Sequence, residues 1–423
     1  MARRTASKSG RLIWISVIRV QHYPEFITSL RSGYPNFADL PWEYPVSDWA
    51  DRCNNLVQVT QGVSRHPILF VNIDGAVYAL KELPLAVAEK EYLALSGLED
   101  MRLPAVIPVG HVQTNTLDSP RSILITNHLK YSIPYRTLFQ SSSLITYRKH
   151  LLDAVSSLLV QLHLAGVYWG DCSLSNTLFR RDAGTLQAYL VDAETLEIFP
   201  DYFPPTHRHQ ELDIMEENIN GELLEMHAED QLPADIPVHD VGAYIRLRYQ
   251  KLWEQITWED IINPNEQYLI QERIQALNSL GYSVGEVELL PTQGGNQLRL
   301  RVVVTDRNYH RDQLLSLTGL EAEEMQARKL VNEIHETRAL LSSAENRNVP
   351  VSVASYHWLK NIYEPTLSAI TPLIRPDMNL PELYCQVLEH KWYMSEKAHH
   401  DVGHQAAAQD YLRKYASPGN HIS

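Results

Sequence analysis

The segment LHLAGVYWGDCSLSNTLF, residues 162–179, places a carboxylate and an amide at a spacing that suits an oxygen-ligand site. Asp171 and Asn176 lie five residues apart, beside Gly170 and several small hydroxyl residues. Asp192, in YLVDAET, adds a second carboxylate at the end of a predicted buried strand. Magnesium takes few protein oxygens and leaves its other positions to water and phosphates, so the set predicts a magnesium-phosphate site. Each residue alone also suits an ordinary capping role in a turn or at a helix start.

Lys81, in the predicted strand VYALKEL, is a candidate phosphate ligand. A lone lysine is costly to bury in a strand unless it meets an anion. Glu91 lies ten residues later on the apolar side of a predicted helix and is a candidate partner, with Glu89 as its competitor. The alternative is a lysine on an edge strand that points to solvent.

Length and composition limit the class of protein. A chain of 423 residues is too long for one ordinary core, so we expect two or three domains. Hydrophobic residues make up 44% and charged residues 21%, as in soluble globular proteins. The net charge of -14 argues against a broad surface for nucleic acids or anionic membranes, which require clustered Lys and Arg.

Cysteine content and hydropathy favour a cytoplasmic protein without a transmembrane segment. The three cysteines show no CxxC spacing, so neither a disulfide framework nor a thiolate zinc site is expected. The apolar run near the N-terminus is short, is broken by Arg19 and lacks a cleavage motif. We interpret it as a tail followed by a strand.

The order of predicted elements indicates an α+β protein. Strands in residues 56–83 are interrupted by Asp74-Gly75, a strong hairpin signal, and are followed by a helix and a strand at 121–129. From about 144 a long helix runs to Gly166 and leads into the loop that carries Asp171. We predict an N-terminal extension, two lobes, an accessory α/β domain and a helical region, at residues 1–50, 51–130, 131–248, 249–345 and 346–423.

The order of these polar residues resembles that of the protein-kinase-like superfamily. In that superfamily a strand lysine, a helix glutamate, a D-x4-N loop and a metal-binding aspartate follow one another. The resemblance implies a two-lobed kinase-like fold, extended here by the accessory domain and the helical region. It also implies ATP and Mg²⁺ as cofactors. Asp171 would accept the proton of the acceptor hydroxyl, Asn176 and Asp192 would hold magnesium, and Lys81, held by Glu91, would bind the nucleotide phosphates.

The same resemblance implies where the nucleotide binds. Backbone groups of residues 125–129, which include Thr126 and His128, would meet the adenine. The phosphate-covering loop TQGVSRHPI would contribute Gly62 and Ser64. Gly62 is the one glycine in a loop that is usually rich in glycine.

Departures from the usual protein-kinase motifs point to a subgroup. Trp169 replaces the His of H-R-D, Ser173 replaces a Lys, and Glu194 follows Asp192 where D-F-G has glycine. This pattern resembles lipopolysaccharide-core (Kdo and heptose) kinases, aminoglycoside phosphotransferases and RIO-type kinases. The kinase-like part is combined with the segments LTGLEAEEMQARKLVNEI and VLEHKWYMSEKAHHDVG. In this combination, the chain from about 40 to 415 resembles a bacterial family of lipopolysaccharide-kinase-like proteins.

Three functional hypotheses follow. The first is a phosphotransferase that moves the γ-phosphate of ATP to a hydroxyl of a small molecule or a sugar-bearing lipid. The second is a pseudokinase or nucleotide-dependent binding module, whose residues 249–423 recruit a protein partner; Trp169 and the glycine-poor loop motivate it. The third is a RIO-like protein kinase, motivated by Ser173. The acceptor and the oligomeric state stay open.

Four further features have weaker chemical interpretations. His163 is expected to brace the loop, and Asp213 is either a hydrogen-bond acceptor for the loop backbone or a plain first-turn carboxylate. Cys172 has no activating histidine in sequence and is not expected to be a nucleophile. The triplet Glu396, His400 and His404 has helical spacing, but an exposed polar helix face is favoured over a metal site.

Overall fold

The computed structural model divides into two compact units. Unit 1 comprises Met1–Phe179 and Ala188–Gln250, and unit 2 comprises Arg180–Gln187 and Lys251–Ser423. The structure describes residues 18–23, 26–59, 66–114, 121–140, 145–200, 203–233, 236, 238–257, 260–262, 286–291, 298–303, 309–376 and 378–415.

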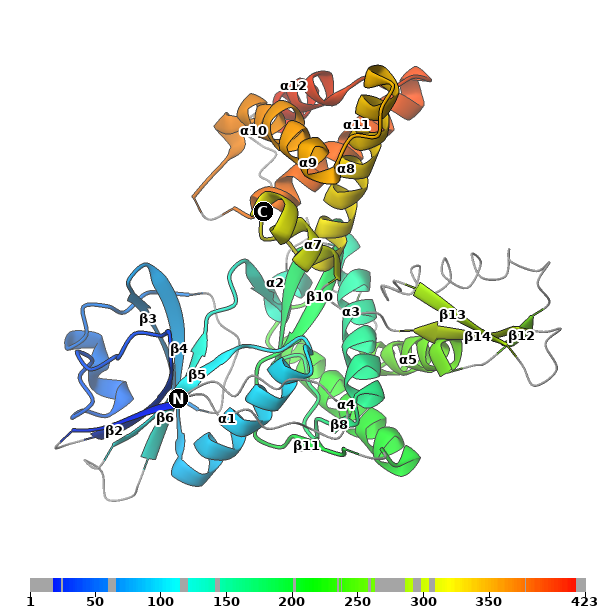
Figure 1. Cartoon of the computed structure of the whole chain (residues 1–423). Coiled ribbons are helices and arrows are strands. Elements are labelled where there is room, and N and C mark those ends of the chain that lie inside the picture. Colours follow the sequence, from blue (N-terminus) through cyan, green and yellow to red (C-terminus); the bar gives the residue numbers. More distant parts are fainter. Residues whose placement is uncertain are drawn as a thin grey trace. The chain divides into compact units, whose positions relative to one another are not determined.

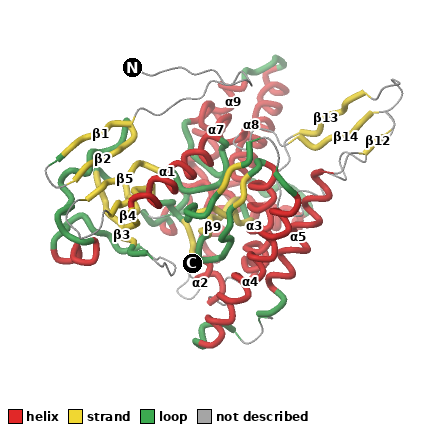
Figure 2. Tube along the Cα trace, turned by 90° about the horizontal axis from the view of Figure 1, so that it is seen from below, coloured by secondary structure: helices red, strands yellow, loops and turns green. Residues whose placement is uncertain are grey.

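A six-stranded antiparallel sheet with strand order β1-β2-β5-β6-β4-β3 forms the first part of unit 1. Helix α1 (Leu85–Asp100) packs against β4, β5 and β6 (Figures 1 and 2). The strands are β1 (Ile18–His22), β2 (Phe26–Arg31), β3 (Ile68–Ile73), β4 (Ala76–Pro84), β5 (Pro108–Thr114) and β6 (Arg121–Asn127).

The hairpin predicted at Asp74-Gly75 is confirmed. Both residues have positive φ, 54° and 82°, as a type I′ turn requires, and Ile73 pairs with Ala76 across the turn. The register then places Lys81 opposite Ile68 on one side and Leu124 on the other. Lys81 is therefore on an inner strand and is buried, so the alternative of an edge-strand lysine facing solvent is wrong.

Residues 18–23 and 26–50, predicted as part of a separate extension, contribute to this lobe. Strand β2 pairs with β5, and the short helix Val46–Asp51 places the fully buried Trp49 in the same core as Trp42. The indole of Trp42 donates to the Phe37 carbonyl (2.7 Å), so its polar atom is satisfied inside the core. The indole of Trp49 donates to the Tyr44 carbonyl (3.1 Å), so both buried tryptophans have a satisfied N–H group.

The remainder of unit 1 is mainly helical. Helices α3, α4 and α5 lie side by side (Figures 1 and 2), joined by hydrogen bonds that include Ser156 to the Ile245 carbonyl. Small sheets with orders β10-β9-β7 and β11-β8 accompany them. The elements are β7 (Ser132–Pro134), α2 (Tyr135–Gln140), α3 (Ile145–Leu164), β8 (Val167–Tyr168), β9 (Thr177–Asp182), β10 (Thr185–Leu190), β11 (Glu197–Ile198), α4 (Pro205–Ala228) and α5 (Val241–Thr257). Residues 180–187 of β9, β10 and their turn are assigned to unit 2.

Unit 2 contains a three-stranded sheet, with order β12-β14-β13, and a helical core. Helix α8 shares one core with α9, α11 and α12, so the boundary predicted at 345/346 does not separate two cores. The elements are β12 (Asp260–Ile262), β13 (Glu286–Pro291), β14 (Leu298–Val303), α7 (Tyr309–Thr318), α8 (Glu324–Glu345), α9 (Val351–Trp358), a π-helical turn (Leu359–Tyr363), α10 (Glu364–Ala369), a 3-10 turn (Thr371–Leu373), α11 (Leu380–Ala398) and α12 (His404–Tyr415).

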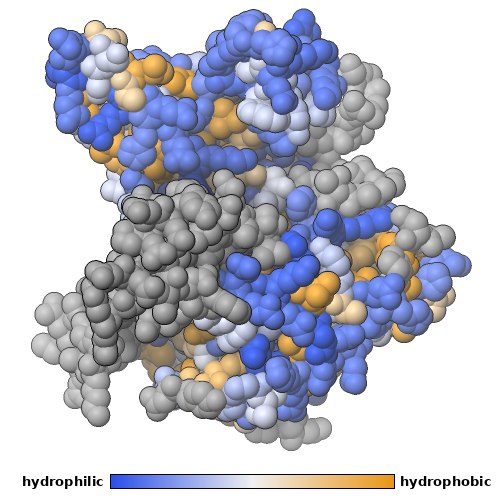
Figure 3. Space-filling model, turned by 90° about the vertical axis from the view of Figure 1, so that its right-hand side faces the viewer, coloured by the Kyte–Doolittle hydropathy of each residue, from blue (hydrophilic) through white to orange (hydrophobic). Residues whose placement is uncertain are grey.

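The surface agrees with the charged composition. On the face shown in Figure 3, hydrophilic residues cover most of the described surface, and apolar residues appear in separate groups. Within the described ranges, the chain has no helix that combines the length and the apolar character needed to span a bilayer.

The first turn of α8 binds a buried carboxylate within unit 2. Asp182 accepts hydrogen bonds from the backbone N–H groups of Met325 (3.0 Å) and Gln326 (2.8 Å). Complete burial, together with the nearby carboxylate of Glu323, raises the pKa of Asp182 to about 8 despite these two donors. The folded state therefore favours the protonated carboxyl group more than the unfolded chain does.

This raised pKa predicts a pH-dependent effect of Asp182→Asn on stability. Because the folded-state pKa lies above the unfolded value, the stability that protonation contributes is present at low pH and is lost as pH rises through about 8. The amide does not ionise. We therefore expect the melting temperature of the variant, relative to the wild type, to rise between pH 5 and pH 9. A constant difference across this range would contradict the pKa assignment.

Candidate active site

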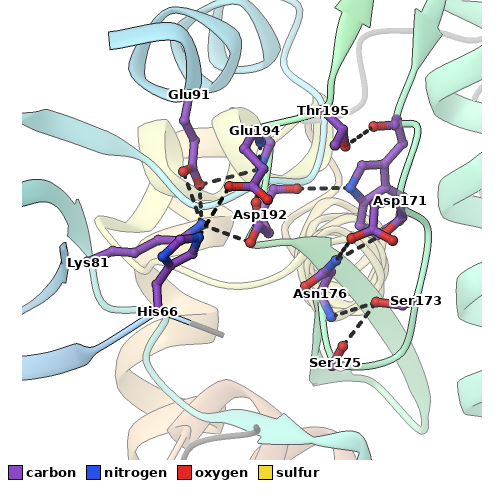
Figure 4. A network of polar contacts seen from close by, with 12 residues as sticks. His66, Lys81, Glu91, Asp171, Ser173, Ser175, Asn176, Asp192, Glu194 and Thr195 are labelled. Carbon is purple, nitrogen blue, oxygen red and sulfur yellow. Dashed lines mark hydrogen bonds and ion pairs between the residues drawn. The ribbon is translucent and has the colours of Figure 1, made fainter. Parts of the chain in front are cut away.

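Lys81 forms ion pairs with two carboxylates. Its Nζ lies 3.0 Å from Glu91 Oε2 and 2.8 Å from Asp192 Oδ2 (Figure 4). Glu91 is on the buried face of α1, whereas Glu89 is exposed, so Glu91 is the partner that the sequence left undecided. A strand, a helix and the segment after β10 therefore meet at one ammonium group.

Burial and ion pairing shift the pKa values of Lys81 and Glu91 in opposite directions. Burial alone would lower the pKa of Lys81, but the charges of Glu91 and Asp192 outweigh it, and the net pKa is raised. Burial raises the pKa of Glu91 to about 7, against the opposing effect of Lys81. The lysine thus stays charged in a site with little solvent.

Asp171 is oriented by two side-chain amides. Asn176 donates to the Asp171 carbonyl (3.1 Å) and to Asp171 Oδ2 (3.2 Å), while Asn218 of α4 donates to Asp171 Oδ1 (3.0 Å) and to the Cys172 carbonyl (3.1 Å). Because both carboxylate oxygens have donors, the Asp171 side chain is held in one orientation.

Carboxylates of α4 bind the backbone of the same loop. Glu211, which is completely buried, accepts from the N–H groups of Trp169 (3.1 Å) and Gly170 (2.8 Å). Gly170 has φ of +83°, a conformation that suits glycine, and this turn aims its N–H at Glu211. Farther along the helix, Glu222 accepts from the N–H groups of Leu174 and Ser175 (2.8 and 2.9 Å). Helix α4 therefore determines the loop conformation.

Of the two alternatives for Asp213, the acceptor of the loop backbone is wrong, because Glu211 has this role, and the first-turn carboxylate is wrong as well, because α4 begins at Pro205. Asp213 is largely exposed and pairs with Arg246. A signal was present in the sequence: residues 211, 218 and 222 are spaced so that they share one face of a helix with apolar positions.

His163 supports Glu211 from α3. Its Nε2 lies 2.9 Å from Glu211 Oε2, and its Nδ1 lies 2.7 Å from the Tyr249 hydroxyl of α5. This buried chain of polar groups links three helices under the loop, so His163 braces the loop as the sequence predicted.

One cavity of unit 1 is lined by the paired lysine and by the predicted metal ligands. Lys81, Glu91, Asn176 and Asp192 line it together with apolar side chains that include Leu124 and Leu178. Thr126 and His128, predicted to lie near the adenine, also line it. Gly62 and Ser64 lie outside the described residues.

The site has a donor set that fits a magnesium ion. Carboxylate oxygens of Glu91, Asp192 and Glu194 lie within 4.8 Å of one another, and Asn176 lines the same cavity. Carboxylate and amide oxygens are ligands that magnesium prefers. Glu194 is also 3.6 Å from His66 Nε2.

The comparisons with known proteins agree with this geometry. Residues 72–217 match the family model described as "Lipopolysaccharide kinase (Kdo/WaaP) family". The stretch that carries Lys81, Asp171 and Asp192 is therefore similar to that kinase family. Residues 251–416 match a second model, "Domain of unknown function (DUF4032)". No curated protein matches the chain. A solved structure titled "WaaP in complex with acyl carrier protein" is similar at 15% identity and a TM-score of 0.33, and the match covers 53% of this chain and 88% of that one.

The match to the family model agrees with the predicted two-lobed α+β kinase-like fold, and Trp169 has a defined place in that fold. The Trp169 indole donates to the Asp192 carbonyl (2.9 Å), and Thr195 donates to the Trp169 carbonyl (2.7 Å). The tryptophan thus joins the Asp171 loop to the Asp192 segment. Trp169 therefore has a structural role at this site.

Two other features of the sequence do not contribute to the chemistry of this site. Cys172 is completely buried, and burial raises the pKa of its thiol, which disfavours a nucleophilic role. In unit 2, α11 ends at Ala398 and α12 begins at His404, so Glu396, His400 and His404 do not share one helix face.

We predict that Glu211→Ala destabilises unit 1 by about 3 kcal/mol, because it leaves buried N–H groups and His163 without their charged acceptor. Asp213→Ala is the matched control on the same helix, and its exposed ion pair contributes about 0.5 kcal/mol or less. Denaturant unfolding followed by tryptophan fluorescence measures both. Equal losses in the two variants would contradict the role of Glu211.

Proposed function

We propose that this chain is an ATP- and Mg²⁺-dependent phosphotransferase that transfers the γ-phosphoryl group to a hydroxyl of a small molecule or sugar-bearing lipid. The main support is the position of Lys81 Nζ between Glu91 and Asp192, at a cavity that Asn176 also lines. The match to the lipopolysaccharide kinase family supports the acceptor class.

Lys81 would exchange one partner when nucleotide binds. Its contact with Glu91 fixes the ammonium group, and its contact with Asp192 neutralises that carboxylate before phosphates arrive. On binding, Lys81 would contact phosphate oxygens and leave Asp192 available as a ligand together with Asn176. A magnesium ion held there would neutralise phosphate charge.

Asp171 would act as the base toward the acceptor hydroxyl. The amides of Asn176 and Asn218 hold its carboxylate in one orientation, so no rearrangement of that side chain is needed for proton transfer. Catalysis in this class depends on positioning and charge neutralisation more than on covalent help, so these groups suffice.

The adenine contact would involve fewer backbone groups than the sequence suggested. The N–H groups of Asn127 and His128 already donate to the carbonyls of Ile107 (2.9 Å) and Val77 (3.0 Å). Leu129 lines the cavity, and within the described ranges its N–H has no hydrogen-bond partner. We therefore assign the donor to adenine to Leu129.

Ser173 does not favour a RIO-like protein kinase. Its hydroxyl is buried, accepts from the Asn176 N–H (3.2 Å) and lies 3.1 Å from the Ser175 hydroxyl. These contacts give Ser173 a structural role inside the loop, and a hydroxyl held this way is not presented to a protein acceptor.

Asp171→Asn is predicted to lower phosphoryl transfer by ~100-fold or more, because the amide cannot accept the proton. Nucleotide affinity is expected to change little, since Lys81 and Asp192 are intact. ADP release or autophosphorylation measures transfer, and titration with a fluorescent ATP analogue measures binding. Asp213→Asn is the control, and undiminished turnover in Asp171→Asn would remove Asp171 from the mechanism.

Purified wild-type protein with ATP and Mg²⁺ is expected to give turnover or autophosphorylation, together with a thermal shift. Removal of Mg²⁺ by EDTA should abolish turnover, and Lys81→Ala should abolish the shift because the phosphate contact is lost. A thermal shift without turnover across sugar, lipid and small-alcohol acceptors would support a pseudokinase instead.

A further inference from the structure

The two proposed metal ligands stand at the two ends of one β-hairpin. Strand β9 begins at Thr177, directly after Asn176, and β10 ends at Leu190, two residues before Asp192. At the base of the hairpin, the Val191 N–H donates to the Asn176 carbonyl (3.1 Å). The backbone geometry of this hairpin therefore determines how far apart the two ligands lie.

The tip of the same hairpin is part of unit 2. Residues Arg180–Gln187 belong to that unit, and side chains of α8 and α11 bind their backbone. Gln326 donates to the Arg181 carbonyl (3.0 Å), Lys329 donates to the Ala183 carbonyl (3.0 Å), and Glu382 accepts from the Ala183 N–H (2.7 Å). We call Gln326, Lys329 and Glu382 the anchor residues.

The anchor residues form a connected network. Gln326 and Glu382 are buried and bond each other (2.8 Å), and Asp182 adds its two bonds to the first turn of α8. Arg180 pairs with Glu323 at the same place. Tips of hairpins are ordinarily exposed and mobile, and their backbone groups bond to water. Here the backbone of the tip is bonded to protein, which restricts its motion.

We propose that the anchor residues of the DUF4032-like unit are positioning residues for Asn176 and Asp192, acting through the β9–β10 hairpin. The inference rests on the proposed function, because it assigns the helical unit a role in the metal site of that reaction. Strands β9 and β10 are hydrogen-bonded neighbours in one sheet, so a displacement of the tip would shift the base, where Asn176 and Asp192 lie. Without an anchor residue, Asn176 and Asp192 would therefore be held less precisely, and magnesium binding would be weaker.

Another polar cluster of unit 2 provides a matched control. Glu333 of α8 accepts from the Trp358 indole (3.1 Å) and the Tyr384 hydroxyl (2.7 Å), and it pairs with His404 (2.8 Å). It lies one helical turn after Lys329 and does not bond to the hairpin tip. Its loss would disturb the helical core and leave the anchor residues in place.

The test measures the Mg²⁺ concentration that half-saturates binding of a fluorescent ATP analogue to the full chain. Glu382→Ala is expected to raise this concentration roughly tenfold, at the lower end of the loss seen when a residue that orients a metal ligand is removed. Lys329→Ala, which removes one bond from a partly exposed side chain, is expected to raise it about threefold and to fold normally. Glu333→Ala is expected to stay within about twofold of the wild type.

Thermal unfolding of each variant separates positioning from stability. The inference is supported if both anchor variants raise the half-saturating Mg²⁺ concentration. It also requires that Glu333→Ala lowers the melting temperature without changing that concentration. Should Glu382→Ala fail to fold, Lys329→Ala decides alone. The inference would be overturned if the folded anchor variants kept the wild-type half-saturating Mg²⁺ concentration. An equal rise of this concentration in Glu333→Ala would overturn it as well. Absence of Mg²⁺-dependent binding in the wild type would instead overturn the proposed function, and this inference with it.

Discussion

The buried ammonium group of Lys81 is the constraint on which the site depends. A charge in a site with little solvent is tolerated only with close counter-charges, and Glu91 and Asp192 provide them at 3.0 and 2.8 Å. Because these carboxylates come from α1 and from the segment after β10, the pairing holds a helix, a strand and a loop in one arrangement. A phosphate chain is an anion of the kind that can replace one of the two partners.

The loop that carries Asp171 is held by side chains of helix α4, in addition to the bonds that its own Asn176 and Ser173 make. Glu211, Asn218 and Glu222 bind six polar groups of the loop, and His163 links Glu211 to Tyr249. A loop with so many bonded backbone groups loses little further entropy when it binds a substrate. Trp169 extends the same principle, since its indole joins this loop to the Asp192 segment.

Local signals in the sequence were sufficient for the parts of the fold that depend on local geometry. Asp74-Gly75 marks its hairpin because both positions need positive φ, and the order of Lys81, Glu91, Asp171, Asn176 and Asp192 indicated the kinase-like fold. Long-range partners were not predictable in this way. Glu211 and Asp213 are both acidic residues of helix α4, two positions apart, and only the packing of α4 decides which is buried. The separation of residues 346–423 from α8 failed because a polar linker does not reveal that the helices on both sides share a core.

The most direct test of the account is a crystal structure with a non-hydrolysable ATP analogue and Mn²⁺, whose anomalous signal locates the ion. We expect the ion beside Asp192 and Asn176, Lys81 within hydrogen-bond distance of phosphate oxygens, and the Lys81–Glu91 pair intact. A nucleotide bound elsewhere, or a Lys81–Asp192 pair that persists with nucleotide in the cavity, would contradict the account.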